Sequence, residues 1–400
     1  MGPAEGTHKG SVKPGSAGVP STIAEAIVRC LRLGNVALYE KTQARTPALP
    51  GIRKKTHNSI NPSNDGKSKG REMKQMKNIV KVMATLALMA TTATVAMAQT
   101  HGAKIFVIGG KADDPFWSKV KKGADDAGLV AAAQGGSVIW LGPQNYDNLG
   151  PDAAKLIRTA LSQHPDAIVG PDWVPEAMDE AFKEVVAAHV PLIIYNSGGM
   201  DAAKRLGAMN YVGNDEYTAG LGGGDYFASH GAKNVLCVNT LPGATNTEAR
   251  CKGIADGIAK SGGKSSQLPL PSSSFGNPTA VAQAIKAALL KDQSIDGAIT
   301  ISAGDANSAA NAISQANVGE KVKLASFDMD ETGLQRIKDG TQLFSIDQQP
   351  YLQGYLAVSL LNGFVNYGLD LPTKPVLTGP GIVSKDNVDT TLAGAKAGAR

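Results

Sequence analysis

From residue 103 onward, short apolar runs alternate with longer segments whose apolar residues recur at helical spacing. The run at residues 104–108 is too short and too rich in β-branched residues for a buried helix, so it predicts a buried strand. Further strands are expected at residues 137–141, 167–169, 192–195 and 210–212, with helices at residues 116–133, 151–163 and 175–188. Strands and helices that alternate in this way form a parallel α/β lobe.

The second half of the chain repeats this alternation. Strands are expected at residues 234–238, 264–268, 297–301, 323–327 and 341–346, with helices at residues 216–229, 247–261, 278–290, 306–315 and 331–338. A last long helix at residues 350–366 carries an apolar face of its own. The glycine-rich residues 220–224 fall within a predicted helix, which favours a close-packing surface over a phosphate-binding loop. The fold class is therefore α/β, with two doubly wound parallel-sheet lobes.

The first 98 residues differ from the rest of the chain. Residues 1–72 are rich in Gly, Pro, Ser, Lys and Arg without sustained periodicity, and we interpret them as a disordered or non-native extension. Residues 73–98 have a basic start, an apolar middle and a small-residue ending at Ala96 and Ala98, which is the pattern of a secretory signal peptide cleaved before Gln99. A transmembrane anchor is the alternative, although the apolar run falls short of the ~20 residues that a span needs.

Basic residues are concentrated in the same first segment. Residues 1–98 hold 15 of the 40 Lys and Arg and 5 of the 35 Asp and Glu, so the formal charge of +5 becomes −5 for residues 99–400. No later segment combines a basic patch with interleaved aromatic residues. A nucleic-acid partner is therefore not expected for the mature chain.

Two of the three cysteines, Cys237 and Cys251, belong to the mature chain. Cys237 lies in a predicted strand and Cys251 in the helix that follows, so the two can meet where that helix packs on the sheet. An oxidising compartment would permit a disulfide, which would stabilise the fold by roughly 3 kcal/mol in the chain-entropy model. Two buried free thiols are the alternative. No Cys and His spacing indicates a zinc site, and neither a metal nor a cofactor is expected.

The residues after the first strand give the first indication of function. Asp113, Asp114, Phe116 and Trp117 follow a strand end, which is where open parallel sheets bind ligands. Aromatic rings stack on the apolar face of a sugar, and carboxylates accept hydrogen bonds from its hydroxyls. Carbohydrate binding is therefore indicated, with packing of both rings into the core as the alternative.

Short motifs occur along the chain in a recognisable order. They are Asp-Asp-Pro-Phe-Trp at 113–117, Val-Pro-Leu-Ile-Ile-Tyr-Asn at 190–196, Tyr-Val-Gly-Asn-Asp-Glu at 211–216, Arg-Cys-Lys-Gly at 250–253, Phe-Asp at 327–328 and Asp-Gln-Gln-Pro at 347–350. The ordered set resembles the periplasmic sugar-binding proteins of ABC importers, of the ribose-binding type. The resemblance covers residues 103 to about 384 and implies two lobes that are joined by three crossings and close on a sugar. It places the crossings near residues 212–214, 347–350 and 371–375.

The resemblance also implies a domain division and a ligand-binding set. Residues 99–213 with 348–373 would form the N-terminal lobe, and residues 214–347 with 374–400 the C-terminal lobe. The ligand-binding residues that it implies are Asp114, Phe116, Trp117, Asn196, Asn214, Glu216, Arg250, Phe327, Asp328 and Gln348. Asp172 and Trp173, just after the third strand, are expected to complete the site.

Three positions depart from the pattern of ribose binders. Gly170 and Gly304 stand where those proteins often have asparagine, and Asn196 stands where the family commonly has an acid. These changes argue against ribose as the ligand. Arg250 and Asp328 are expected to be opposite buried charges that hold hydroxyls in a planar, bidentate way, with a purely structural ion pair as the alternative.

Two other functions fit parts of the sequence. Asp-Met-Asp-Glu-Thr at 328–332 matches the signature of haloacid-dehalogenase-like phosphatases, in which the first acid attacks phosphorus and the second acts as an acid or base. No adjacent acid pair for magnesium follows it. A sugar-responsive repressor shares the two-lobe fold, but it needs a helix-turn-helix where this chain has the predicted signal peptide.

The prediction is a monomeric solute-binding protein that is exported to the periplasm and is not an enzyme. It would capture a monosaccharide or related polyol and deliver it to the membrane permease of an ABC importer. A sugar-sensing regulator, or a ligand-binding protein that serves a chemoreceptor, is the alternative of the same fold.

Overall fold

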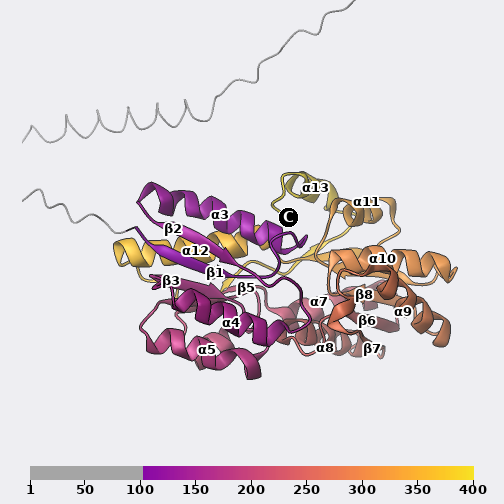
Figure 1. Ribbon diagram of the computed structural model, residues 1–400. Helices are drawn as coiled ribbons and strands as arrows, with labels where there is room; N and C mark the ends of the chain where they lie inside the picture. The colour runs from indigo at the N-terminus through magenta and orange to yellow at the C-terminus, as the bar shows by residue number, and fades with distance from the viewer. Residues whose placement is uncertain (1–101) are drawn as a thin grey trace, which may run out of the picture. The chain divides into compact units, whose positions relative to one another are not determined.

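Two six-stranded sheets form the framework of the part of the chain that the computed structural model describes, residues 102–400 (Figure 1). The predicted extension at residues 1–72 and the predicted signal peptide at residues 73–98 lie outside the described residues. We call each sheet, together with the helices packed on it, a lobe. No helix within residues 102–400 has the length and apolar character needed to span a membrane.

The first lobe is built from a regular alternation of strands and helices. Its elements are β1 (Lys104–Ile108), α3 (Trp117–Ala133), β2 (Ser137–Leu141), α4 (Leu149–Leu161), β3 (Ala167–Gly170), α5 (Pro175–Ala187), β4 (Leu192–Tyr195), α6 (Gly199–Leu206) and β5 (Asn210–Gly213). The long helix α12 (Pro350–Tyr367) also packs on this sheet, next to α3. Figure 1 shows α3 and α12 on one face of the sheet and α4 and α5 on the other.

The second lobe repeats the pattern. Its elements are α7 (Glu216–Ser229), β6 (Asn234–Asn239), α8 (Thr245–Ala259), β7 (Lys264–Pro269), the short 3-10 helix η1 (Ser272–Ser274), α9 (Pro278–Lys291), β8 (Gly297–Thr300), α10 (Ala303–Gln315), β9 (Lys323–Phe327), α11 (Glu331–Asp339), β10 (Phe344–Asp347) and α13 (Val388–Lys396). Separate apolar clusters lie on the two faces of its sheet.

The first five strands of each sheet have the same spatial order. The sheets read β11-β5-β4-β3-β1-β2 and β12-β10-β9-β8-β6-β7, where β11 is Val376–Leu377 and β12 is Gly381–Val383. All pairs are parallel except β10 with β12, which is antiparallel. The structure therefore confirms the predicted fold class of two doubly wound sheets, whose strand ends carry loops toward one edge of each lobe.

The glycine-rich stretch at 220–224 lies inside α7, as predicted, and lets α7 pack closely on α8. A Cβ on Gly220 would lie 2.2 Å from the carbonyl oxygen of Arg250, and one on Gly224 would lie 2.5 Å from that of Ile254. No larger side chain fits at either position without displacing a backbone. This close approach matters for the site, because it brings the first turn of α7 up to Arg250.

Several elements were not predicted from the sequence. Helix α6 is short and is flanked by Gly198 and Gly207, both with positive φ, so it carries little periodic signal. Helix α13 and the two-to-three-residue strands β11 and β12 were also missed. Because β11 pairs with β5 in the first sheet, the last crossing falls between Leu377 and Gly381 rather than at residues 371–375.

Candidate functional site

A cavity of about 700 Å³ is lined by residues that follow strands of both sheets. Predicted ligand-binding residues that line it are Asp114, Phe116, Trp117, Trp173, Asn196, Arg250, Asp328 and Gln348. The remaining predicted residues, Asp172, Asn214, Glu216 and Phe327, are buried and do not line it. The cavity is therefore the candidate site, and the predicted residues that do not line it can affect a ligand only through neighbouring residues.

The first lobe contributes three aromatic side chains, Phe116, Trp117 and Trp173, which we call the aromatic wall. The Trp117 ring is only 7% exposed and lies edge-on to Trp173, with 5.4 Å between ring centroids. It also contacts Trp140 and Tyr195 on the core side. Trp117 therefore belongs both to the core and to the cavity, and its packing fixes the surface that it presents.

Asp114 positions the aromatic wall. Its Oδ1 accepts hydrogen bonds from the backbone N–H groups of Phe116 (2.9 Å) and Trp117 (3.1 Å), which satisfies donors at the start of α3. Its Oδ2 accepts a hydrogen bond from the Tyr146 hydroxyl at 3.3 Å. Burial raises the pKa of the Asp114 carboxyl, although these hydrogen bonds oppose the shift.

The second lobe contributes charged side chains, Arg250, Asp305 and Asp328, which we call the polar wall. Arg250 and Asp328, which were expected to be opposite buried charges, both line the cavity, but the hydrogen-bonded carboxylate partner of Arg250 is Glu216. Arg250 donates from Nε to Glu216 Oε2 at 2.7 Å and from Nη2 to Glu216 Oε1 at 3.0 Å. The close packing of α7 on α8 brings Glu216 into this position, so the bidentate pair forms behind the cavity surface.

The other hidden residues support the same arginine. Phe327 is fully buried, and the Arg250 guanidinium lies over its ring at 4.6 Å from the centroid. The Arg250 Nη1 also donates to the carbonyl oxygen of Ile301 at 3.0 Å. Asn214 donates from Nδ2 to Glu216 Oε2 at 3.2 Å. Glu216, Phe327 and Asn214 therefore fix the orientation of Arg250 from behind.

Asp328 and Asn196 occupy equivalent positions in the two lobes. Each is the first residue after the fourth strand of its sheet, and each has a φ of 60°. Each donates its N–H to the neighbouring strand, Asn196 to the Val212 oxygen at 3.0 Å and Asp328 to the Ile346 oxygen at 2.9 Å. Non-glycine residues in this left-handed region are uncommon and concentrate at functional sites.

The Asp328 carboxyl is held in a buried, polar environment. Gln348 donates from Nε2 to Asp328 Oδ1 at 2.6 Å. Burial raises the pKa of Asp328 to about 7, while the charge of Arg250 and the Gln348 hydrogen bond oppose the rise. Near neutral pH this carboxyl can therefore exist in either protonation state.

Three buried amide oxygens at the cavity have no hydrogen-bond partner. They are Asn196 Oδ1, Asn246 Oδ1 and Gln348 Oε1. The amide nitrogens of Asn196 and Gln348 donate to Gln353 Oε1 (3.1 Å) and Asp328 Oδ1, so the orientation of both amides follows from their partners. Buried acceptors are normally satisfied, so these oxygens indicate a ligand that supplies hydrogen-bond donors.

Asp172 and Trp173, which were predicted to act together, have separate environments. Trp173 lines the cavity, but Asp172 is fully buried outside it and its Oδ2 accepts from Arg205 Nη2 at 2.5 Å. Arg205 also donates to Asp179. Burial raises the pKa of Asp172 to about 6. The Asp172 carboxylate therefore binds Arg205 through Oδ2 and does not line the cavity.

The cavity-lining residues that were not predicted from the sequence include Asn246, Lys119 and Asp305. Lys119 donates from Nζ to the Met329 carbonyl oxygen in the other lobe at 3.0 Å, and burial lowers its pKa. Asp305 accepts from the Thr240 hydroxyl at 2.7 Å, and burial raises its pKa to about 6. All three lie in the first turns of helices that begin beside the cavity, a position that becomes recognisable only once the helix starts are known.

Gly170 and Gly304, which stand where ribose binders often have asparagine, have different surroundings. At Gly170 an added Cβ would lie 2.9 Å from the ring of Phe182, so Phe182 fills the space that a side chain would need. At Gly304, which lines the cavity, the nearest atom to an added Cβ is Ser302 Oγ at 3.9 Å. Only Gly304 therefore leaves open space that enlarges the cavity.

The phosphatase-like motif has a structural explanation in this fold. Asp330, its second acid, accepts from the Gly333 N–H at 2.6 Å as the N-cap of α11 and accepts from Asn307 Nδ2 at 2.8 Å. Within residues 102–400, no three His, Cys, Asp or Glu side chains lie together in a metal-binding arrangement. The motif residues therefore serve the helix start and the polar wall.

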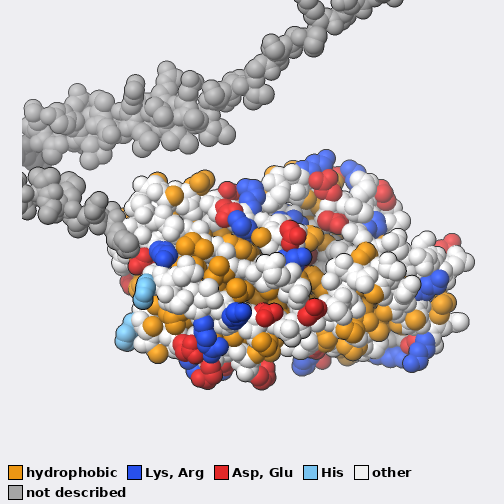
Figure 2. Space-filling model, viewed as in Figure 1, with side chains coloured by type: hydrophobic (Ala, Val, Ile, Leu, Met, Phe, Trp, Pro, Cys, Tyr) orange, Lys and Arg blue, Asp and Glu red, His pale blue; other side chains and the backbone are white. Residues whose placement is uncertain are grey.

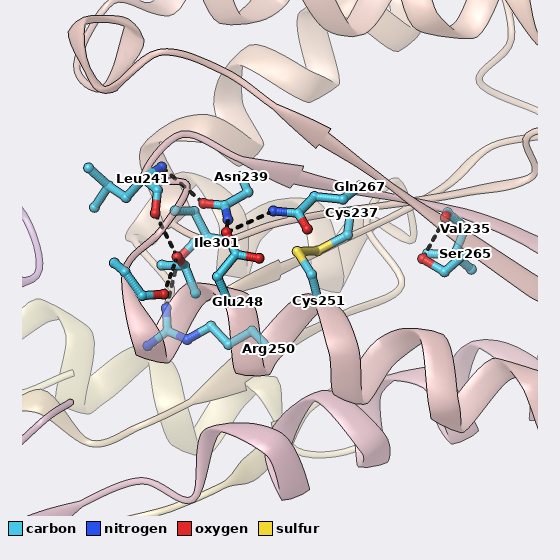
Figure 3. The surroundings of a disulfide bond; sticks show 12 residues. Val235, Cys237, Asn239, Leu241, Glu248, Arg250, Cys251, Ser265, Gln267 and Ile301 are labelled. Carbon is cyan, nitrogen blue, oxygen red and sulfur yellow. Dashed lines mark hydrogen bonds between the residues drawn. A yellow bond between two sulfur atoms is a disulfide. The ribbon is translucent and has the colours of Figure 1, made fainter. Parts of the chain in front are cut away.

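Cys237 in β6 and Cys251 in α8 form a disulfide in the structure, with an S–S distance of 2.00 Å and a Cα–Cα distance of 5.7 Å (Figure 3). Figure 3 shows the bond one residue along α8 from Arg250. The bond joins α8, the helix that carries Arg250, to β6 of the second sheet.

Comparison with known proteins identifies the class. The family model described as "Periplasmic binding protein domain" matches residues 105–368. A crystal structure of a carbohydrate transporter from Acidothermus cellulolyticus in complex with myo-inositol is similar, with a TM-score of 0.68 and 32% identity over 74% of this chain and 99% of that chain. The chain therefore belongs to the periplasmic binding protein family.

Other relatives are also sugar-binding proteins. The chain is 22% identical over 313 residues to a xylose/arabinose-binding protein of Sulfolobus acidocaldarius, covering 73% of this chain and 74% of that protein. A glucose–galactose binding protein from Geobacillus stearothermophilus shares the fold, with a TM-score of 0.62 and 22% identity over 71% of this chain and 98% of that chain. Both relatives are described as sugar-binding proteins.

Proposed function

We propose that this protein binds a monosaccharide or related polyol in the cavity between its lobes and delivers it to the permease of an ABC importer. The observation that carries the proposal is the set of unpartnered buried acceptors, Asn196 Oδ1, Asn246 Oδ1 and Gln348 Oε1, on a cavity with an aromatic wall. A polyol supplies hydroxyl donors to such oxygens and an apolar C–H face to the rings.

Within that class, a cyclitol such as myo-inositol is the first candidate. The relative at 32% identity was crystallised with myo-inositol. Myo-inositol carries a hydroxyl donor on every ring carbon, which suits acceptors that approach from both lobes. The open space at Gly304 favours a ligand that reaches farther toward α10 than a pentose. Gly304→Asn should therefore weaken cyclitol binding more than pentose binding.

We assign the cavity-lining residues of the aromatic and polar walls, together with Asp114, Asn196, Asn246 and Gln348, to direct ligand contact. Asn214, Glu216 and Phe327 are assigned to holding Arg250, because none of the three lines the cavity. The assignment predicts that ligand protects Trp117 and Trp173 from fluorescence quenching by iodide. Equal quenching with and without bound ligand would contradict it.

We further propose that the chain is exported and that its mature form begins at Gln99. Members of the family in ABC importers act outside the cytoplasm, which supports the proposal. The Cys237–Cys251 pair would then be oxidised in the periplasm. N-terminal sequencing of the exported protein tests the cleavage, and retention of residues 1–72 would contradict it. Thiol counting under denaturing, non-reducing conditions tests the disulfide, which predicts no free thiol in the mature chain.

We propose that the two lobes move as separate bodies. One body comprises residues 99–213 with 348–373, and the other comprises residues 214–347 with 374–400. Strand β11 is an exception, because it pairs with β5 in the first sheet and therefore moves with the first lobe. Rotation about the crossings would open and close the cavity. Small-angle scattering should show compaction when ligand is added. An unchanged radius of gyration at saturating ligand would contradict hinge closure.

We propose that the protein is a monomer that does not bind nucleic acid. A chemoreceptor is proposed as a further partner, which would bind the same closed conformation. Figure 2 shows acidic and basic side chains interspersed over the visible face, which supports the absence of nucleic-acid binding. A sugar-sensing regulator of the same fold has no specific support among the described contacts, so binding for transport is the function that we propose.

Isothermal titration calorimetry with a panel of cyclitols, pentoses, hexoses and linear polyols tests the proposed function. Native mass spectrometry of protein purified from its host adds the ligand that the protein retains. Binding of at least one neutral polyol at micromolar concentration or below is expected. Absence of binding across the panel, with no retained polyol, would contradict the proposal.

A further inference from the structure

The two lobes touch through a small group of hydrogen bonds beside the cavity. The Thr245 N–H, at the start of α8 in the second lobe, donates to the Trp173 carbonyl oxygen in the first lobe at 2.9 Å. The Thr245 hydroxyl lies 2.8 Å from the Asp172 carbonyl oxygen and 2.8 Å from Ser197 Oγ. Ser197 Oγ lies 3.0 Å from the same Asp172 oxygen. The hydroxyl groups of Thr245 and Ser197 thus supply two protons for three oxygen–oxygen contacts. The Asp172 carbonyl oxygen is the common acceptor for Ser197 in the first lobe and Thr245 in the second.

These residues do not line the cavity, but their sequence neighbours do. Asp172, Ser197 and Thr245 are absent from the cavity surface, whereas Trp173, Asn196 and Asn246 form part of it. Each contact residue is therefore covalently adjacent to a residue that faces the ligand. A ligand that positions Trp173, Asn196 and Asn246 also positions the backbone that carries the hydrogen bonds between lobes.

The contacts lie away from the crossings. Asp172 follows β3, and β3 is separated from β5, which leads into the first crossing, by β4. Two strand spacings place it roughly 10 Å from that crossing. Rotation of the lobes about the crossings therefore moves Thr245 away from Asp172 and breaks these hydrogen bonds.

We propose that the Asp172 carbonyl group, Ser197 and Thr245 form a closure latch, which stabilises the closed conformation without touching the ligand. The inference rests on the proposed function, since it concerns how the same cavity retains its ligand. A contact made only in the closed conformation raises the affinity for every ligand by the same factor, because it shifts the closed population rather than the fit. Thr245 and Ser197 are thus positioning residues for retention.

The test compares Thr245→Val, which removes the hydroxyl at nearly constant volume, with Thr245→Ser, which keeps it. Both are titrated with myo-inositol and with D-arabinose, and dissociation rates are measured by stopped-flow tryptophan fluorescence. Thr245→Val should raise the Kd of each ligand about three- to tenfold, mainly by faster dissociation, since one net hydrogen bond is worth ~0.5 to 1.5 kcal/mol. Thr245→Ser should remain within about twofold of wild type.

A double-mutant cycle then separates the latch from a local packing effect. Ser197→Ala and Thr245→Val should together cost less than the sum of their separate effects, because they share the Asp172 carbonyl. The melting temperature of the ligand-free protein should be unchanged in Thr245→Val, since the open form lacks the contacts of Thr245 with the first lobe, whereas Ser197→Ala also loses a hydrogen bond to Asp172 within the first lobe.

Distinct results would overturn the inference and the proposed function. A wild type that binds neither probe contradicts binding of these polyols. A wild type that binds either probe, with Thr245→Val binding it equally well, contradicts the latch. A Thr245→Val variant that changes the ratio of the two affinities also contradicts the latch, because Thr245 would then contact the ligand.

Discussion

The two lobes share one strand order but present different chemistry to the cavity. The aromatic wall comes from the first lobe, and the polar wall comes from the second. The clearest contrast is between Asn196 and Asp328, which have the same place after the fourth strand, the same φ of 60° and equivalent backbone hydrogen bonds. One carries a neutral amide and the other a carboxyl whose pKa burial raises to about 7.

The two lobes fix their cavity-lining side chains in different ways. Trp117 is fixed by packing against Trp140 and Tyr195, so the aromatic wall depends on the core. Arg250 is fixed by Glu216, and Asp328 by Gln348, so the polar wall depends on individual buried partners. Changes behind the polar wall should therefore have larger effects than their distance from the ligand suggests.

The largest effect is expected from Glu216→Gln, which leaves the buried Arg250 without its carboxylate. Loss of one partner of a buried ion pair typically costs about 3 to 5 kcal/mol of stability. The matched control is Glu184→Gln, because Arg158 and Glu184 also form a bidentate pair but are each 47% exposed. Urea unfolding should show a large loss for the first variant and little change for the second. Equal losses would show that burial does not distinguish the two pairs.

Trp117→Ala should have the next largest effect, about 3 kcal/mol of stability, because a nearly buried ring is removed from the core. Affinity for the ligand should fall as well, since the same ring lines the cavity. Phe116→Ala serves as the control, because Phe116 lines the cavity and is only partly buried. It should lower affinity with a smaller loss of stability. Wild-type stability of Trp117→Ala would show that this ring does not contribute to the stability of the core.

Asp328→Asn should weaken binding by about 2 kcal/mol, the typical value of a hydrogen bond to a charged group. Asparagine can still accept from Gln348 through its Oδ1, so the local structure should persist. Wild-type affinity should fall as pH decreases through about 7, because protonation removes the charged acceptor. The variant should lose this pH dependence in calorimetry between pH 5.5 and 8.5, conditions chosen as about 1.5 units either side of that pKa. Equal pH profiles would assign the titration to another group.

The last comparison concerns the stability of the ligand-free protein against pH. Burial raises the pKa of Asp328 from ~3.9 in the unfolded chain to about 7 in the folded protein. The folded state therefore binds the proton more tightly, and stability falls as pH rises from about 4 to about 7. Asp328→Asn should reduce this decline and melt higher than wild type above pH 7.

Three other acidic residues bear on this measurement of stability against pH. Asp172 and Asp305, with pKa values raised to about 6, should leave a residual decline at lower pH in the Asp328→Asn protein. Asp113→Asn is the control, because the Asp113 side chain is 80% exposed. A melting curve of Asp328→Asn that follows wild type at every pH would contradict the assignment of the titration to Asp328.

Most of the fold could be predicted from the sequence because strand and helix periodicity is a local property. The alternation of strand and helix patterns located the ten strands β1 to β10, and the order of the motifs indicated the family to which the chain belongs. The glycines at 220–224 were expected at a close helix contact and lie at one. Short elements such as α6, β11 and β12 were missed, because so few residues carry no periodic signal of their own.

The tertiary structure alone decided which partners the polar side chains have. The sequence indicated that Arg250, Glu216 and Asp328 belong to one region, but the bidentate pair is Arg250 with Glu216. Similarly, Asp172 pairs with Arg205 while Trp173 beside it lines the cavity. Periodicity along the chain fixes which elements form, whereas a hydrogen bond depends on distances of a few tenths of an ångström between elements far apart in sequence, and those distances are set by how the helices and sheets pack.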